Sequence, residues 1–282
     1  EGKTQIELGC ISGLDEIYGG AEQADVGSHV VLTLTSGHYN KVYGGNNLGG
    51  KILGSITVNI EQTGCLPIEI GELYLGGNNA PYSVYGYDDN GIIRGGTKVY
   101  PDPVMNLRSF KSIGTVFGGG EGAGAELAGD PTINVNVATG WVDGQYRRTD
   151  DNDPNSQYHA APQALTPDGV IGTIFGGGNA AQVTGNTTIN IGDQSTVEMH
   201  SLSAIKERID ATQEKKLIMG GIVFELSDDK NSIKYTVQGQ NTPAMTQPII
   251  QTVNGANITG NVYGGGNQAD VTGGTNVVIG KE

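Results

Sequence analysis

Ile174-Phe175-Gly176-Gly177 joins an apolar residue, an aromatic residue and a pair of glycines, and Asn179 follows shortly afterwards. The signature recurs along the chain, and two degenerate copies fit the same pattern. The other complete copies are Ile17-Tyr18-Gly19-Gly20, Val42-Tyr43-Gly44-Gly45, Val116-Phe117-Gly118-Gly119 and Val262-Tyr263-Gly264-Gly265, and the degenerate ones are Tyr74-Leu75-Gly76-Gly77 and Ile218-Met219-Gly220-Gly221. Several copies continue with a polar residue, at Asn46, Asn78, Glu121, Asn179 and Asn267. Internal similarity of this kind is typical of a repeat architecture.

A second segment follows most copies about ten residues later, and it has the alternating pattern of a half-buried β-strand. Ile133-Asn134-Val135-Asn136-Val137 is an example, and Ile189-Asn190-Ile191 is another. We expect a strand of the same kind at Ile233–Val237. The shortest interval between aromatic positions, from Tyr18 to Tyr43, is 25 residues. We therefore expect a repeating unit of this length, with loop insertions where the interval is longer.

These repeats predict an all-β fold of a single domain over residues 1–282. The expected architecture is a right-handed parallel β-helix, a solenoid in which each unit hydrogen-bonds to its neighbours. Tight corners need the backbone freedom of glycine, and equivalent side chains of successive units are expected to stack. The expected corner glycines are Gly44, Gly118, Gly176 and Gly264, and the expected stacks are formed by Tyr18, Tyr43, Phe117, Phe175 and Tyr263 and by Asn179 and Asn267. An irregular β-sandwich or β-roll is the alternative, since spacing alone does not distinguish them.

The composition argues against several classes of protein. Glycine supplies 47 of the 282 residues, against an average of about 7%, and each interior glycine weakens a helix by about 1 kcal/mol. Collagen requires glycine at about one residue in three, so it is also excluded. The formal net charge of −14 argues against nucleic-acid binding, which depends on a basic face. No segment approaches the roughly 20 apolar residues of a membrane-spanning helix.

The two cysteines, Cys10 and Cys65, each follow a glycine. The repeat is expected to place them about two coils apart, a separation larger than a disulfide normally spans. We therefore interpret them as two buried free thiols, although the sequence leaves pairing open.

Three insertions interrupt the repeat, near residues 79–95, 140–170 and 194–216. The third holds the one predicted helix, because Leu202, Ile205 and Ile209 fall at helical spacing. In solenoids, insertions gather on one face, and that face is often the binding face.

The insertions also hold the candidate ligand-binding residues. Trp141 is the single tryptophan, and an exposed aromatic ring with hydrogen-bonding neighbours is suited to binding a sugar ring. The alternative is that Trp141 anchors the base of its insertion to the solenoid. The full candidate set is Trp141, Tyr146, Arg147 and Arg148 from the second insertion and Tyr85 and Tyr87 from the first.

A calcium site is a weaker candidate, at Asp151, Asp153 and Asn155, whose oxygen-bearing side chains alternate. An EF-hand is excluded, because Ser156 and Pro162 stand where that loop needs glycine and a bidentate glutamate. We expect no cofactor, no zinc site and no catalytic constellation.

The segments 174–191 and 262–274 carry a resemblance to a known group of proteins. Ile174-Phe175-Gly176-Gly177-Gly178-Asn179 with Val183-Thr184-Gly185-Asn186-Thr187 is similar to the Y-G-G-G-N and V-T-G-N-T repeats of large surface proteins from gut Bacteroidetes-type bacteria. The similarity is weaker at 17–64 and 116–140, so it covers roughly half of the chain. These proteins are described as adhesins with β-helical stalks. The resemblance implies an extracellular or cell-surface location and a larger parent protein, and it implies no catalytic residues.

Together these observations predict a non-catalytic module for adhesion, with a glycan or a host protein as partner. The alternative is a polysaccharide lyase or glycoside hydrolase, which rests on fold analogy alone. Such an enzyme would require Arg147 or Arg148 to face Asp150 and Asp151 across a groove.

Overall fold

A computed structural model gives the structure of the following residues of the chain. These are 3–8, 13–62, 66–143, 145–146, 159–160, 169–193, 198–200, 206, 209–210, 212–213, 215–219, 222–226, 228, 233–236, 244–245, 249–255 and 257–281. Cys10 and Cys65 lie outside them, so the prediction of free thiols is not tested.

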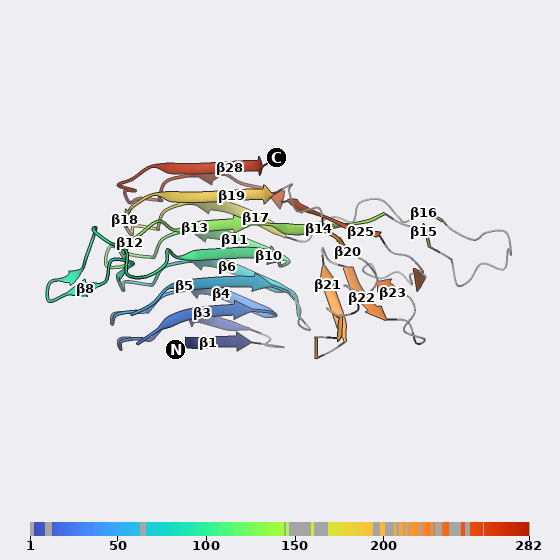
Figure 1. The fold of residues 1–282 in the computed structure, drawn as a ribbon, viewed down its shortest axis with the longest axis horizontal. Helices are drawn as coiled ribbons and strands as arrows, with labels where there is room; N and C mark the ends of the chain where they lie inside the picture. The colour runs from blue at the N-terminus through green and yellow to red at the C-terminus, as the bar shows by residue number, and fades with distance from the viewer. Residues whose placement is uncertain are drawn as a thin grey trace.

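Three parallel sheets make up the body of the molecule (Figure 1). The first sheet contains, in spatial order, β1 (Lys3–Leu8), β3 (His29–Leu34), β5 (Ile56–Glu61), β10 (Val104–Ser109), β13 (Thr132–Val135), β19 (Thr187–Asp193) and β28 (Thr275–Lys281). The second contains β2 (Leu14–Tyr18), β4 (Gly37–Tyr43), β6 (Ile68–Tyr74), β11 (Ser112–Phe117) and β17 (Val170–Phe175), and then β26 (Asn257–Ile258) and β27 (Val262–Tyr263), which both pair with β17. The third, much shorter, contains β7 (Tyr82–Ser83), β12 (Leu127–Ala128) and β18 (Val183–Thr184).

The chain visits these sheets in a repeating order, from the second sheet through a glycine corner to the first sheet and back. The repeat signatures at Val42, Val116, Ile174 and Val262 therefore lie in one parallel sheet, on β4, β11, β17 and β27. This confirms the prediction of an all-β fold built from parallel sheets, and it is consistent with a β-solenoid. A β-sandwich differs, because its two sheets are antiparallel.

The core lies between the sheets and is built from rows of aliphatic side chains. In the first sheet, Leu32, Val58, Met105, Ile133 and Ile189 occupy equivalent positions in successive strands, and all are fully buried. On the outer face of the same sheet, Asn59, Asn106, Asn134 and Asn190 form a ladder of amide hydrogen bonds of 3.0 Å. The alternation of apolar and polar residues thus places one row inside and the next row outside.

Aromatic rings form a second ladder beside the glycine corners, which we call the aromatic ladder. Tyr18, Tyr43, Tyr74, Phe117, Phe175 and Tyr263 stack in sequence, with centroids 4.6 to 5.1 Å apart and ring planes within 13° of parallel. The predicted stack is therefore confirmed, and Tyr74 is an additional member. The predicted amide stack is also confirmed, because the Asn267 amide donates to Asn179 Oδ1 at 3.1 Å.

The degenerate copy at 74–77 is displaced by one residue from the predicted alignment. Tyr74, rather than Leu75, pairs with Tyr43 and Phe117. Leu75 takes the place of the first corner glycine, because its N–H donates to Phe117 O as the Gly44 N–H donates to Tyr74 O. Leu75 is fully buried, so this corner gains core contact where the others have glycine.

The degenerate copy at 218–221 was wrongly assigned to the repeat. β21 (Lys216–Met219) pairs with β22 (Ile222–Leu226), and β22 with β23 (Ile233–Thr236), in an antiparallel sheet that ends in β24 (Ala244–Met245). A glycine pair between antiparallel strands is also the sequence of a two-residue hairpin. The strand predicted at 233–237 therefore exists as β23, but it belongs to this sheet and not to the parallel stack.

The insertions leave the stack at two different places, which corrects the expectation that they share one face. The first follows β7 and carries a small hairpin of β8 (Tyr87–Asp88) and β9 (Gly91–Ile92). The second and third leave between the first and second sheets, on the opposite side of Figure 1. There β14 (Val137–Asp143), β25 (Ile249–Gly255) and β20 (Glu198–His200) join them in an antiparallel sheet.

The remaining pieces of these insertions are short. β15 (Gln145–Tyr146) pairs with β16 (His159–Ala160). The described residues contain no complete helix: of the helix predicted within 194–216, Lys206, Ile209 and Asp210 have helical backbone. Ile209 is fully buried, as its predicted apolar face requires.

The tyrosine hydroxyls of the aromatic ladder meet a row of carboxylates. Tyr18 donates to Glu16 at 2.6 Å, Tyr43 donates to Glu121, and Tyr74 donates to Glu72 at 2.9 Å. Burial, followed by the hydrogen bond to Glu16, raises the pKa of Tyr18 from 10.0 to about 12. Burial is also the main cause that raises the pKa values of Tyr43 and Tyr74.

These shifts predict alkaline unfolding. An acid whose pKa is higher in the folded state stabilises the fold below its unfolded pKa, and this contribution is lost as the pH rises through the folded pKa. For Tyr18 the loss begins near pH 10 and is complete near pH 12. We expect tyrosinate absorbance and loss of the β-sheet circular dichroism signal to rise together in this range, and Tyr18→Phe to raise the midpoint. Ionisation of all tyrosines near pH 10 with an unchanged dichroism spectrum would contradict this.

Candidate binding groove

A shallow groove crosses the outer face of the second sheet, and we refer to it as the groove. Its volume is about 560 Å³, and residues of four successive strands, β2, β4, β6 and β11, contribute to its lining. The lining residues are Gly13, Leu14, Asp15, His38, Tyr39, Asn40, Glu69, Ile70, Gly71 and Ser112.

A column of glycines runs along this face, and one of its members, Gly71, lines the groove. Gly71, Gly114 and Gly172 are equivalent in register, and Gly260 follows them by donating to Gly172 O. A Cβ atom on Gly71 would lie 2.5 Å from Asn40 O, and one on Gly114 would lie 2.5 Å from Gly71 O. Each coil therefore approaches the next too closely for a side chain, and a strip of bare backbone results.

The sequence carries a signal for this column that the repeat signature did not include. Each of these glycines stands three residues before a member of the aromatic ladder, at Tyr74, Phe117, Phe175 and Tyr263. The regular offset marks a second close approach in each unit, in addition to the corner.

One wall of the groove is a charged network around Glu69. Its carboxylate lies 2.5 Å from Lys111 Nζ and 3.1 Å from His38 Nε2. The hydrogen bond from Lys111 holds the pKa of the Glu69 carboxyl below its ordinary value, and the His38 charge acts in the same direction. Glu69 is therefore a carboxylate at neutral pH, able to accept hydrogen bonds but unsuited to donating a proton.

The N-terminal end of the groove combines an apolar and a polar residue. Leu14 is 40% exposed, and Asp15 beside it is also exposed. Asp15 Oδ1 accepts a hydrogen bond from the Asn40 amide at 3.2 Å. Leu14 stands in the row of Tyr39 and Ile70, which faces the core. The open face of the groove thus offers carboxylates, an amide and an imidazole, which suits binding of a hydroxyl-rich ligand.

The residues predicted to bind a ligand lie elsewhere or outside the described part of the chain. Trp141 stands on β14 opposite Gln251, and Tyr146 stands on β15 opposite His159, so both belong to the insertions. Arg147, Arg148 and the calcium candidates Asp151, Asp153 and Asn155 lie outside the described residues. Where side chains are described, no group of three or more metal-ligating residues occurs.

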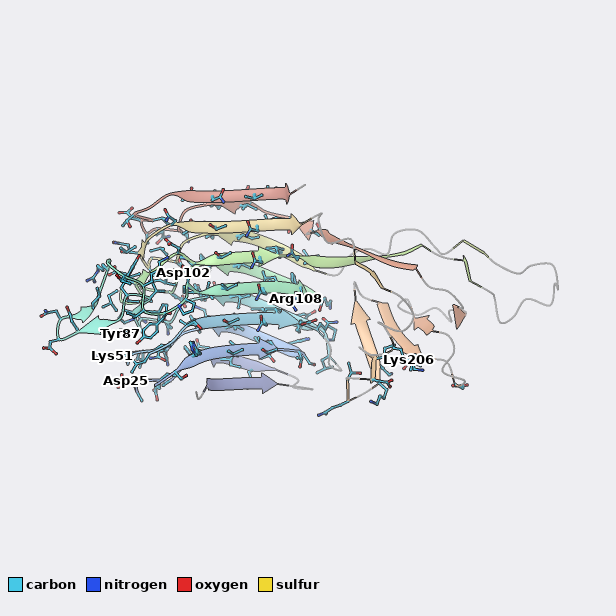
Figure 2. All side chains as sticks on the ribbon, viewed as in Figure 1. Asp25, Lys51, Tyr87, Asp102, Arg108 and Lys206 are labelled. Atoms are coloured by element: carbon cyan, nitrogen blue, oxygen red, sulfur yellow. The ribbon has the colours of Figure 1, made fainter. Side chains whose placement is uncertain are left out.

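Tyr85 and Tyr87 have contacts that attach the first insertion to the stack. The Tyr87 hydroxyl accepts a hydrogen bond from the Ile52 N–H at 3.1 Å, and Lys51 Nζ lies 5.7 Å from the centre of its ring. Figure 2 shows Tyr87 and Lys51 next to each other at this side of the molecule. Tyr85 is half-buried and packs against the main core. Neither residue lines the groove.

Comparisons with known proteins add no relative to this description. The chain matches no protein-family model, no curated protein and no solved structure. In the part of the chain that the structure covers, no helix has the length and apolar character needed to cross a bilayer.

Proposed function

We propose that the chain is a non-catalytic module of an extracellular or cell-surface protein and that it binds a glycan chain along the groove. The observation that carries the proposal is a groove lined by side chains from four successive strands of one parallel sheet. The proposed scaffold is a right-handed parallel β-helix. Its support is the repeated passage of the chain between the second and first sheets, with a strand of the short third sheet between them at β7, β12 and β18.

The shape of the groove favours an extended ligand. Adjacent strands of a sheet are about 4.8 Å apart, so four strands span roughly 14 Å along the stack. β4 and β6 are each paired on both sides, so neither offers a free edge for a peptide to join as a further strand. Recognition at β4 and β6 must therefore use their outward side chains, which favours a chain of hydroxyl groups over a β-strand added there.

The electrostatics of the groove favour binding over hydrolysis. Glycoside hydrolysis requires a carboxylic acid whose pKa is raised so that it can protonate the leaving oxygen. The pKa of Glu69 is shifted the opposite way, first by Lys111. The enzyme alternative, a lyase or hydrolase using Arg147 or Arg148 with Asp150 and Asp151, rests on residues outside the described part of the chain.

Blocking the groove tests this proposal. Ser112 lines the groove, whereas Thr115 lies three residues later on the same strand and does not line it. We expect Ser112→Trp to weaken binding of a glycan selected on an array by at least about tenfold, which corresponds to about 1.4 kcal/mol, because the indole ring fills the groove and excludes the ligand. Thr115→Trp is the matched control and should retain affinity. Isothermal titration calorimetry measures both.

The same ligands should be incubated with the chain and assayed for new reducing ends or unsaturated products. Binding without product supports the proposed module. Product formation abolished by Arg147→Ala or Asp150→Ala would establish the enzyme alternative, and equal loss of affinity in both tryptophan variants would remove the groove as the site.

A further inference from the structure

We propose that copies of this chain stack head to tail, with the N-terminal coil of one copy on the C-terminal coil of the next. The N-terminal coil consists of β1 and β2, and the C-terminal coil consists of β26, β27 and β28. Figure 1 shows β1 and β28 at opposite ends of the stack of parallel strands. The inference goes beyond the proposed function, because it concerns the two ends of the stack and does not require a ligand in the groove.

The C-terminal coil exposes positions that are buried in the coil before it. Val277 and Ile279 are 39% and 69% exposed, whereas their partners on β19, Ile189 and Ile191, are buried. Tyr263, at this end of the aromatic ladder, is 46% exposed. The terminal repeats of a solenoid usually carry a polar outer face that acts as a cap. Here the rows that form the core continue to the surface, and a further coil would bury them.

The corner of the C-terminal coil holds a glycine that its own chain does not require. A Cβ atom on Gly119 would lie 2.7 Å from Gly178 N, and one on Gly177, the equivalent residue of the next coil, would lie 2.9 Å from Gly266 Cα. Gly265 follows in this series, because the Gly177 N–H donates to Gly265 O. A Cβ atom on Gly265 has no neighbour within 4 Å, and its φ lies outside the left-handed region. A coil stacked in the same register would supply the close approach that glycine permits at the other two corners.

The N-terminal coil presents members of the same rows. Leu14 is 40% exposed, although Tyr39, its partner in the next coil, is buried. Continuing the register of the stack from one copy to the next places Ile6 on Val277, Leu14 on Ile258 and Tyr18 on Tyr263. The contact between copies therefore continues the interface that already joins successive coils within the chain.

The backbone at the two ends is complementary as well. β1 and β28 are the edge strands of the first sheet, and an edge strand can pair with another chain. At the corners, Gly19 N–H donates to Tyr43 O and Gly176 N–H donates to Tyr263 O, each in the coil that follows. By the same rule, the Gly264 N–H of one copy would donate to Tyr18 O of the next. Donor and acceptor lie at opposite ends of the molecule, which favours a head-to-tail contact over a contact of two like ends.

The charges of the chain oppose association at long range but not at the contact. A formal net charge of −14 makes copies repel one another. In the continued register, Asp15 and Glu16 of one copy would face Gly260 and Asn261 of the other, so no like charges meet there. Salt screens the repulsion between the copies and leaves the apolar contact in place, so association should become stronger as salt is added.

Sedimentation velocity over a series of protein concentrations, at low and high salt, tests the inference on the full chain. We expect species larger than a dimer, because a head-to-tail contact does not close after two copies. Gly265→Val should weaken association at least about tenfold, because its side chain would meet the backbone of the next copy. Gly95→Val is the matched control, since a Cβ atom there also has no neighbour within 4 Å and the residue lies in the first insertion. Both variants should unfold in urea like the unmodified chain.

A mixture of two variants tests the direction of the contact. Leu14→Lys blocks the N-terminal end, and Gly265→Val or Ile279→Lys blocks the C-terminal end. Each variant alone should remain monomeric where the unmodified chain associates, and an equimolar mixture of one variant of each kind should form a mixed dimer and nothing larger.

Three results would overturn the inference. The first is an unmodified chain that stays monomeric at every concentration and salt. The second is association of Gly265→Val and Ile279→Lys as strong as that of the unmodified chain. The third is dimerisation of Leu14→Lys alone, which would show that two C-terminal ends meet. None of these measurements includes a glycan, so their failure is distinguishable from failure of the proposed function.

Discussion

Gly176→Val is expected to destabilise the fold by about 3 kcal/mol or more, in the upper range for overpacked sites. A Cβ atom at this position would lie 2.2 Å from Gly264 O and 3.0 Å from Thr187 Oγ1. The carbonyl group belongs to the neighbouring coil, which is held in place because the Gly176 N–H donates to Tyr263 O at 2.8 Å. Relief of the clash therefore requires separating two coils.

Two further glycines provide the comparison for this experiment. A Cβ atom on Gly95 has no neighbour within 4 Å, so Gly95→Val should change the free energy of unfolding little. The three atoms nearest to a Cβ atom on Gly264 belong to the side chains of Thr275 and Val277, which can shift more easily than backbone, so Gly264→Val should be intermediate. Urea unfolding followed by circular dichroism gives the three values. Similar values for Gly176→Val and Gly95→Val would contradict the close approach between coils.

Phe117→Ala is expected to cost about 3–5 kcal/mol of unfolding free energy, as for other buried aromatic residues. Phe117 is 3% exposed and lies between Tyr74, at 4.6 Å, and Phe175, at 5.1 Å. Its removal leaves a gap in the middle of the aromatic ladder that the two flanking coils cannot close, because their strands are joined by backbone hydrogen bonds on both sides.

Tyr263→Ala is the matched control, since among the described residues this ring stacks on Phe175 alone, and it is 46% exposed. Its loss should cost about 1 kcal/mol, in proportion to the smaller area removed from water. Phe117→Leu retains most of the buried volume and should fall between the two. Equal costs for Phe117→Ala and Tyr263→Ala in urea unfolding would show that the ladder is not a source of stability.

The tight corners were predictable from the sequence because each repeat unit carries the same steric requirement for glycine. A corner that approaches the next coil within van der Waals distance admits little besides glycine, so the corners at Gly44, Gly118 and Gly176 are visible in the sequence. The rings at Tyr18, Tyr43 and Phe117 lie at a constant offset from those corners, and constant register then stacks them.

Where one local pattern fits two structures, the prediction failed. The glycine pair at 220–221 is compatible in sequence with a corner and with a hairpin, and the antiparallel pairing of the flanking strands β21 and β22 sets this segment apart from the parallel stack. At 74–77 the corner was correctly predicted, but its alignment was wrong by one residue. The prediction placed Leu75 at the position of the ladder rings, whereas Tyr74 occupies it. Both errors arise because pairing partners, rather than the residues of one segment, distinguish the alternatives.

The groove could not be predicted from the sequence, and only the tertiary structure reveals it. Asp15, Asn40 and Glu69 lie in three different units of the sequence, and nothing local to any of them indicates a binding surface. Gly71 packs closely against the Asn40 backbone and carries no side chain, so the sheet surface is open at this point. The hydrogen-bonded register of the strands then places the neighbouring side chains around the groove. Sequence alone was sufficient for the complete copies of the repeat, for their corners and for the rings that stack beside them, because the same steric constraint recurs in each unit. The groove arises only when the register brings distant units together.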